Sequence, residues 1–336
     1  MPSRVVRSRR LRVATYNVLH GGEGRESLIS GVLARLDADV VALQEASDLG
    51  LVDRLAGRLG MSVAVGEPSD PASTFNLVVL SRVPVHRTHN HRHGGMLRSH
   101  LEVEVRPASR ALPAIGLHVV HLAARFGERG HGEARRMREL GSVLADIAAA
   151  PDRVPHLLLG DLNAIAPGDT VEATTFLARM TELRRAGLLV RGDDGFDAPI
   201  ARPEVDDPAH DARWRELGIN PRLDVGISRL PSLLGAVTAR VPRHPVIDRA
   251  LGLRIRRDCL AHMGALGYVD CYRRLREDSG YTCATWALVS RIDYLLADPA
   301  LAARLLDCDV VGGARHADPE ATDASDHLPV FADFRL

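Results

Sequence analysis

The sequence of 336 residues contains no lysine, and its 43 basic residues, all arginine, are balanced by 43 acidic residues. This balance gives no whole-molecule attraction to nucleic acid, because dedicated binders are usually visibly basic. Aromatic residues make up only 4% of the chain, which leaves few platforms for stacking against unpaired bases. The composition therefore disfavours a dedicated single-strand binder, although a local basic face remains open.

Cysteines are few and lie far apart, without any C-x-x-C pair. This spacing argues against a zinc ribbon or a redox motif and favours buried free thiols. The cysteines are Cys259, Cys271, Cys283 and Cys308. No apolar run reaches transmembrane length, and the basic N-terminus is not followed by a signal-peptide core. We therefore expect a cytoplasmic protein.

Short apolar runs and segments with helical spacing alternate along the first half of the chain. The short runs predict strands at residues 11–18, 39–43, 76–80, 101–105, 114–122, 154–159, 291–296 and 330–334. The helical spacing predicts helices at residues 27–36, 51–59 and 132–149. Some strands are adjacent, as in a hairpin, and others are separated by a helix. This mixture predicts α/β layers, with two sheets packed together and helices outside.

One domain is expected over residues 8–336, with an insertion at about 187–257. The insertion combines a polar, turn-prone stretch with a segment rich in arginine, proline and leucine. Its prolines prevent a long continuous helix.

Five short polar motifs follow expected strands and lie where a strand gives way to a loop, a common position for site residues. They are Tyr16-Asn17-Val18, Leu43-Gln44-Glu45, Gly160-Asp161-Leu162-Asn163, Arg291-Ile292-Asp293-Tyr294 and Ser325-Asp326-His327. Together they supply hard-metal ligands, a water-orienting carboxylate, amide donors and a carboxylate–histidine pair. Those groups suit metal-assisted cleavage of a phosphate ester.

The third motif places Asp161 and Asn163 two positions apart, which puts both side chains on one face if the backbone is extended. An Asx turn that caps a helix is the competing interpretation. Gly160 permits a close approach of backbone or ligand.

In their order and their positions after strands, the five motifs resemble those of the endonuclease/exonuclease/phosphatase superfamily. That superfamily includes deoxyribonuclease I, apurinic endonucleases, sphingomyelinases and inositol polyphosphate 5-phosphatases. The resemblance runs from about Leu11 to the C-terminus, apart from the stretch near Gly187 to Arg257. It implies a deoxyribonuclease I-like fold, a four-layer α/β sandwich with two packed mixed β-sheets flanked by helices. It also implies a divalent metal, Mg²⁺ or alternatively Mn²⁺.

The resemblance implies Glu45 as the principal metal ligand, with Asp326 as a second ligand and Asn17 close by. It assigns to Asp161 the orientation or deprotonation of the attacking water. Asn163, together with Asn17, is expected to hold the phosphate by hydrogen bonds.

Two histidines have implied roles near the reacting phosphate. His327 is expected to stabilise the transition state, with Asp293 orienting the ring and raising its pKa. His121 matches a histidine that protonates the leaving group in the deoxyribonuclease and sphingomyelinase branches. His118, three positions earlier, should face the other side of the strand and have a structural role.

Five further histidines crowd one segment, and we expect a mobile loop near the mouth of the site rather than a zinc site there. They are His86, His89, His91, His93 and His100. Arg98 is a candidate phosphate contact. The arginines of residues 240–257 fit a polyanion guide and a solvated helix face equally well. They are Arg240, Arg243, Arg249, Arg254, Arg256 and Arg257.

We predict a magnesium-dependent phosphodiester hydrolase, with a nuclease as the first interpretation. A lipid or small-molecule phosphodiesterase, similar to sphingomyelinase, is the alternative, because the charge is neutral and the insertion carries apolar side chains. Those side chains are Leu230, Leu233, Leu234 and Val237. A 5-phosphatase is disfavoured by the lack of lysine. A non-catalytic binding module is disfavoured because every main polar position is retained.

Overall fold

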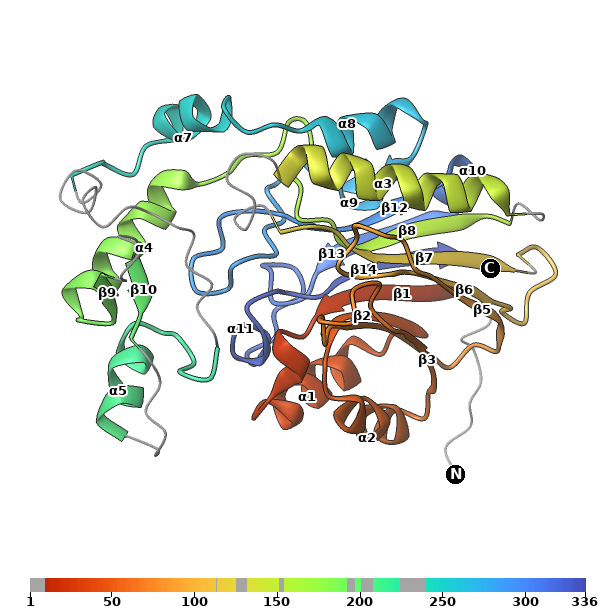
Figure 1. The fold of residues 1–336 in the computed structure, drawn as a ribbon, viewed down its shortest axis with the longest axis horizontal. Coiled ribbons are helices and arrows are strands. Elements are labelled where there is room, and N and C mark those ends of the chain that lie inside the picture. Colours follow the sequence, from red (N-terminus) through yellow and green to blue (C-terminus); the bar gives the residue numbers. More distant parts are fainter. Residues whose placement is uncertain are drawn as a thin grey trace.

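The computed structural model describes residues 10–112, 114–124, 132–150, 154–191, 197–200, 208–223 and 240–336. Within these residues the chain forms two six-stranded mixed sheets that pack face to face, with helices on their outer faces (Figure 1). The predicted four-layer α/β sandwich is therefore confirmed.

The first sheet, sheet A, has the strand order β13-β14-β1-β2-β4-β3. Its central strand β1 is parallel to β2 and antiparallel to β14, so the first and the last strand of the chain lie side by side. Helices α1 and α2 lie against the outer side of this sheet (Figure 1). The elements are β1 (Arg10–Asn17), β2 (Val40–Ala46), β3 (Ser62–Gly66), β4 (Asn76–Ser81), β13 (Leu305–Val310), β14 (Val330–Arg335), η1 (His20–Gly22), α1 (Glu26–Leu36), α2 (Leu49–Leu59) and α11 (Ala321–Ala324).

The second sheet, sheet B, has the strand order β11-β12-β8-β7-β6-β5. Helix α3 connects β7 to the parallel strand β8 and, with α8, covers the outer face of this sheet (Figure 1). The elements are β5 (Val85–His91), β6 (His100–Val105), β7 (Ile115–His121), β8 (His156–Asp161), β11 (Val269–Asp270), β12 (Asp293–Ala297), α3 (Gly132–Ala149), α8 (Asp258–Ala265), α9 (Cys271–Leu275) and α10 (Pro299–Ala302).

Strand β7 shows how the side-chain alternation of a strand builds both layers of core. Leu117 and Val119 belong to the large apolar cluster that includes the inner faces of the sheets. Val120 and, just past the strand, Leu122 belong to a second cluster with side chains of α3 and α8. Side chains at odd separations along β7 therefore serve opposite faces, as expected for a strand.

A smaller unit extends to one side of the sandwich, at the left of Figure 1. It has its own apolar cluster, which includes Met180, Trp214 and Trp286. Its elements are α4 (Ala173–Arg185), β9 (Leu189–Arg191), β10 (Asp197–Pro199), α5 (Pro208–Glu216) and α7 (Pro245–Gly252). The apolar side chains at positions 230, 233, 234 and 237 lie outside the described residues. In the part of the chain that is described, no helix combines the length and apolar character of a membrane span.

The histidine-rich segment differs from the mobile loop that we expected. His86, His89 and His91 lie in β5, and His100 begins β6, so only residues 92–99 form a connection. Strand β5 is an edge strand, whose side chains need not follow the apolar alternation of a central strand. The polar composition that indicated a loop is instead that of a sheet edge.

Gly160 is required where β8 approaches β7. Its φ is +137°, and an added Cβ would lie 1.9 Å from the carbonyl oxygen of Val120.

We predict that Gly160→Ala lowers the free energy of unfolding by about 2–4 kcal/mol, measured by urea denaturation. The control is Gly141→Ala, an exposed position of α3 where an added Cβ meets nothing within 4 Å. That change should stabilise by up to about 1 kcal/mol. Equal stability of wild type and Gly160→Ala would contradict the requirement.

Candidate active site

The register of sheet B brings three predicted site residues into one row. His121 pairs with Asp161 between β7 and β8, and Asp161 pairs with Asp293 between β8 and β12. Laterally paired residues point to the same face of a sheet. All three side chains lie at the ends of their strands and are buried. The row forms the sheet B half of the site.

Asn17, the last residue of β1, connects this row to sheet A. Its Nδ2 donates to Glu45 Oε1 at 3.2 Å and to Asp161 Oδ2 at 3.2 Å. Its Oδ1 accepts from the backbone N–H of Leu19 at 3.0 Å. The amide therefore turns its NH₂ group, and not its carbonyl, toward the two carboxylates. A role as metal ligand would need the amide to rotate.

Glu45 has an unusual backbone conformation. Its φ is +59°, which is uncommon for a residue other than glycine. The pairing of β2 with β4 shifts register between Leu43 and Ala46, so Glu45 lies in an irregularity of the sheet. Its Oε2 accepts from the backbone N–H of His20 at 3.0 Å. Strained backbone of this kind is typical of functional sites.

The third motif does not stay extended, in contrast to our first interpretation of it. Strand β8 ends at Asp161, and Asn163 has a φ of +49°. The backbone N–H of Asn163 donates to Asp161 Oδ1 at 2.9 Å, which is the hydrogen bond of an Asx turn. Asn163 Nδ2 donates to the carbonyl of Leu122 at 3.1 Å. The turn fixes the carboxylate of Asp161 and leaves its Oδ2 toward Asn17.

His327 and Asp293 form the predicted pair. His327 Nδ1 lies 2.9 Å from Asp293 Oδ2, and Nε2 lies 3.9 Å from Asp161 Oδ2. Burial alone would lower the pKa of His327, but the carboxylates of Asp293 and Asp326 outweigh burial and raise the pKa well above its ordinary value. The imidazole is therefore a buried cation that faces Asp161.

Acidic groups crowd this site. Burial and the charge of Asp293 raise the pKa of Asp161, and burial and the charge of Glu45 raise the pKa of Asp326. Repulsion among carboxylates is relieved by a cation, and hard divalent cations prefer such oxygen ligands. The donor set of Glu45 and Asp326 thus fits a magnesium-class ion.

Two groups of ligand atoms at the site have all their atoms within 4.8 Å of one another. One is Asp161, Asp293 and His327, and the other is Cys283, Asp326 and His327. We interpret His327 as a charged partner rather than a ligand, because its raised pKa favours the protonated ring, and a histidine must be neutral to bind a metal. Glu45 belongs to neither group and reaches the site through Asn17.

His121 faces the site and His118 faces away from it, as the strand period predicted. His121 Nε2 lies 3.4 Å from Asp161 Oδ2, whereas its Nδ1 is buried without a partner. Burial, with smaller contributions from Arg98 and His327, lowers the pKa of His121 well below its ordinary value. His121 is therefore neutral in this state of the site, and proton donation would require a bound anion to raise its pKa.

A sequence model of the Endonuclease/Exonuclease/phosphatase family matches residues 14–327. The chain belongs to this family. Membership assigns it to the phosphoesterases and accounts for the order of the five motifs. No curated protein matches the chain.

Solved structures of the family share the fold. An endonuclease/exonuclease/phosphatase from Beutenbergia cavernae is 20% identical with a TM-score of 0.56, over 98% of this chain and 72% of that one. An AP endonuclease from Archaeoglobus fulgidus is 17% identical with a TM-score of 0.57, over 96% of this chain and 99% of that one. The 3′ phosphatase NExo from Neisseria, bound to a product DNA hairpin, is 17% identical with a TM-score of 0.53, over 96% of this chain and 99% of that one. At these identities the likeness shows the fold alone.

Arg98 comes to the site from the connection between β5 and β6. Burial lowers its pKa, while Glu45 and Asp161 act in the opposite direction, so both carboxylates lie within its electrostatic reach. Its Nε is buried without a partner, and its guanidinium carbon lies 5.6 Å from the ring centre of Phe75. An unpaired buried donor of this kind is available to a phosphate oxygen.

Three residues near the site were not predicted to take part. Buried Arg25 donates to the carbonyls of Val18, Leu19 and Ala324, and no motif marks it in the sequence. Ser325 Oγ donates to the carbonyl of Asn17 at 2.7 Å. Cys283, a free thiol as predicted, lies beside His327. The position of Ser325 next to Asp326 was the only sequence signal for this group.

The charge of His327 depends on Asp293. We predict that Asp293→Asn lowers the pKa of His327, because burial is then opposed by less negative charge. The measurement is a histidine side-chain NMR titration of the metal-free protein, in which the variant should lose the imidazolium signal at lower pH than wild type. Asp323→Asn, which removes an exposed carboxylate from α11, serves as the control. The pairing would be disproved by identical His327 titrations in wild type and Asp293→Asn.

Proposed function

We propose that the protein is a divalent-cation-dependent hydrolase of phosphodiester bonds in nucleic acid. The observation that supports this best is the Asn17 amide, which joins Glu45 of one sheet to Asp161 of the other, with charged His327 beside them. A magnesium or manganese ion held by Glu45 and Asp326 would neutralise phosphoryl charge and stabilise the leaving oxygen. A cytoplasmic location stays a prediction.

The residues of this chain take distinct parts in the proposed reaction. Asp161 orients the attacking water and accepts its proton, and its raised pKa suits a base near neutral pH. His327 and Arg98 hold the phosphoryl oxygens by charge, and Asn163 adds an amide hydrogen bond. His121 donates to the leaving oxygen once the bound phosphate has raised its pKa.

Nucleic acid is proposed as the substrate for two reasons. Two of the similar structures are named for an AP endonuclease and for a phosphatase bound to a DNA product. In this chain, a cleft of about 880 Å³ between α4, α7 and residues 279–281 is lined by Arg243, Arg249 and Arg257. Arginine suits phosphate through paired hydrogen bonds. The cleft is also lined by Asp169, Glu172 and Asp248, so these arginines support a phosphate contact without giving the cleft a net basic charge.

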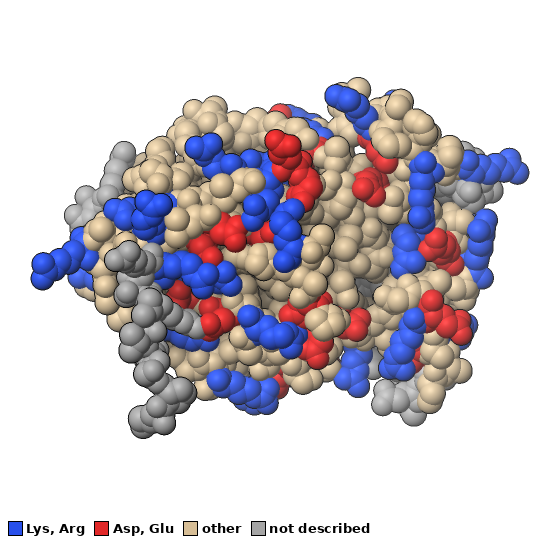
Figure 2. Space-filling model, turned by 180° about the vertical axis from the view of Figure 1, so that it is seen from behind, with Lys and Arg blue, Asp and Glu red and all other residues tan. Residues whose placement is uncertain are grey.

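The alternative is a lipid or small-molecule phosphodiester. On the face seen in Figure 2, arginine and acidic side chains are interspersed and form no continuous basic field. Such a surface supports a short substrate better than a long nucleic-acid track. A non-catalytic binding module is disfavoured, because His121 and His327, the proposed acid and charged partner, both face Asp161, the proposed base.

Metal-dependent hydrolysis can be tested with bis-p-nitrophenyl phosphate. We predict turnover with Mg²⁺ or Mn²⁺ that EDTA abolishes, and a loss of about 10²–10⁴-fold in kcat for Asp161→Asn. Glu45→Gln should raise the Mg²⁺ concentration needed for half activity. Glu277→Gln, an exposed carboxylate, is the control and should match wild type. Near-normal kcat in folded Asp161→Asn would refute the assignment.

The role of His121 can be separated from the rest of the site by the leaving group. We predict that His121→Gln lowers the rate on a DNA phosphodiester by about 10²–10⁴-fold, because an alkoxide needs a proton to leave. The loss on bis-p-nitrophenyl phosphate should be much smaller, since p-nitrophenolate leaves unaided. Equal losses on both substrates would argue against leaving-group donation.

The substrate class is decided by a parallel panel of plasmid DNA, DNA with an abasic site, RNA, sphingomyelin and inositol phosphates. Cleavage of a nucleic acid at rates well above the others supports the proposal. A preference for sphingomyelin or an inositol phosphate would replace the nuclease by the alternative.

A further inference from the structure

A row of imidazole rings crosses the outer face of sheet B, beneath α3. Neighbouring rings are close, with centroids 4.7 Å apart for His91 and His100 and 5.1 Å apart for His100 and His118. The row comes from four adjacent strands and ends at a tyrosine. Its members are His89, His91, His100, His118, His156 and Tyr268. His118 points away from the phosphoesterase site, so the row is separate from that site.

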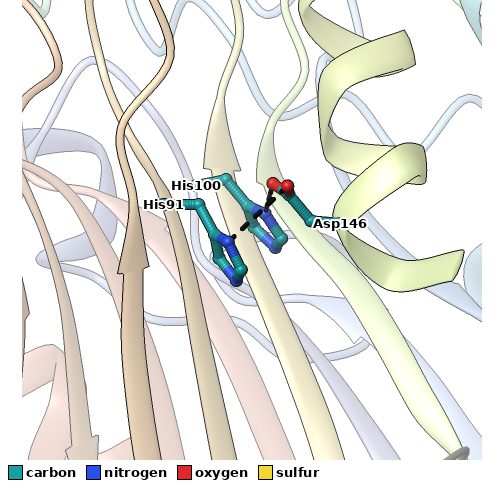
Figure 3. A group of neighbouring side chains, drawn as sticks. All are labelled: His91, His100 and Asp146. Carbon is teal, nitrogen blue, oxygen red and sulfur yellow. Dashed lines mark hydrogen bonds and ion pairs between the residues drawn. The ribbon is translucent and has the colours of Figure 1, made fainter. Parts of the chain in front are cut away.

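Three ligand atoms converge in the middle of this row, where Asp146 of α3 meets the strands (Figure 3). His100 Nδ1 lies 2.8 Å from Asp146 Oδ2, and His91 Nδ1 lies 3.6 Å from Asp146 Oδ1. The three atoms lie within 4.8 Å of one another. His93 Nε2 also lies 2.8 Å from Asp146 Oδ2. His91, His100 and Asp146 thus supply three ligands of a tetrahedral zinc site, and His93, which is not in that group of three but contacts Asp146, is the candidate for the fourth.

The remote ring nitrogens of His91 and His100 already have hydrogen-bond partners. His91 Nε2 lies 2.9 Å from Glu102 Oε2, and the other oxygen of Glu102 accepts from Arg87 at 2.8 Å. His100 Nε2 lies 3.0 Å from His118 Nδ1. Metal-binding histidines almost always have such an outer partner, which fixes the ring and its tautomer.

The type of ligand also indicates the class of metal. A set of ligands rich in imidazole nitrogen prefers zinc-class ions over magnesium, which prefers oxygen.

We propose that His91, His100 and Asp146, with His93 as the fourth ligand, form a structural site for a zinc-class transition-metal ion. The ion would fasten α3 to the edge of sheet B. It would also fix both ends of the connection formed by residues 92–99, which places Arg98 at the phosphoesterase site. The proposal does not depend on the proposed function, because no ligand belongs to the phosphoesterase site.

Cobalt is a suitable probe, because four-coordinate Co²⁺ absorbs visible light. The protein, stripped with EDTA, is titrated with Co²⁺ in excess Mg²⁺. We expect one equivalent to bind with a four-coordinate spectrum that Zn²⁺ abolishes by displacement. His91→Ala and Asp146→Asn should each weaken binding by at least about 100-fold. His86→Ala, an exposed histidine of the same strand, is the matched control and should bind as wild type does.

Two further measurements separate loss of metal binding from loss of folding, and this site from the phosphoesterase site. Circular dichroism without metal confirms that each variant is folded, and Zn²⁺ should raise the Tm of wild type and His86→Ala but not of Asp146→Asn. Glu45→Gln should keep the cobalt spectrum, since Glu45 belongs to the other site. The proposal is overturned if wild type gives no four-coordinate spectrum, if folded His91→Ala and Asp146→Asn bind like His86→Ala, or if Glu45→Gln loses the spectrum.

Discussion

The geometry of the site depends on the hydrogen bonds that the side-chain amide of Asn17 makes. This amide donates hydrogen bonds to carboxylates of both sheets, to Glu45 of sheet A and to Asp161 of sheet B. Ser325 donates to the backbone carbonyl of Asn17, and Arg25 joins the carbonyl of Val18 to that of Ala324, the last residue of α11. Buried polar groups are costly when unpaired, so these bonds specify a single arrangement of the two sheets at this end. Motifs from both ends of the chain converge for that reason.

Much of the fold follows from local sequence patterns. The apolar runs before Glu45 and Gly160 predicted buried strands, and the spacing of residues 132–149 predicted α3 with its observed bounds. These elements were predictable because burial on one or both faces imposes a period on the chain. Strand β5 was not predictable, because an edge strand with polar partners has no alternation of apolar and polar residues. The contact of His91 and His100 with Asp146 was not predictable either, because Asp146 lies 46 positions beyond His100 and reaches it through the tertiary fold.

The sequence predicted which residues lie together at the candidate site, but not the backbone and side-chain conformations that they adopt there. The strand period correctly separated His121 from His118, and the motifs named the residues that the structure brings together. The positive φ of Glu45 and the Asx turn at Asn163 were not predictable, because both depend on the neighbouring strands. The direction of the Asn17 amide depends on the N–H of Leu19 in the same way. Local sequence thus identifies chemical groups, whereas tertiary hydrogen bonds decide how those groups are presented.

The two faces of sheet B are connected by the chain between β5 and β6. This connection, residues 92–99, lies between His91 and His100, both on the outer face. It nevertheless places Arg98 near Glu45 and Asp161 on the inner side. The positions of His91 and His100 therefore limit where Arg98, whose Nε is buried without a partner, can lie. Because Arg98 is only two residues before His100, little chain is available to absorb a shift of that anchor. Packing of α3 on the outer face and the position of Arg98 on the inner face are thus constrained by the same few residues.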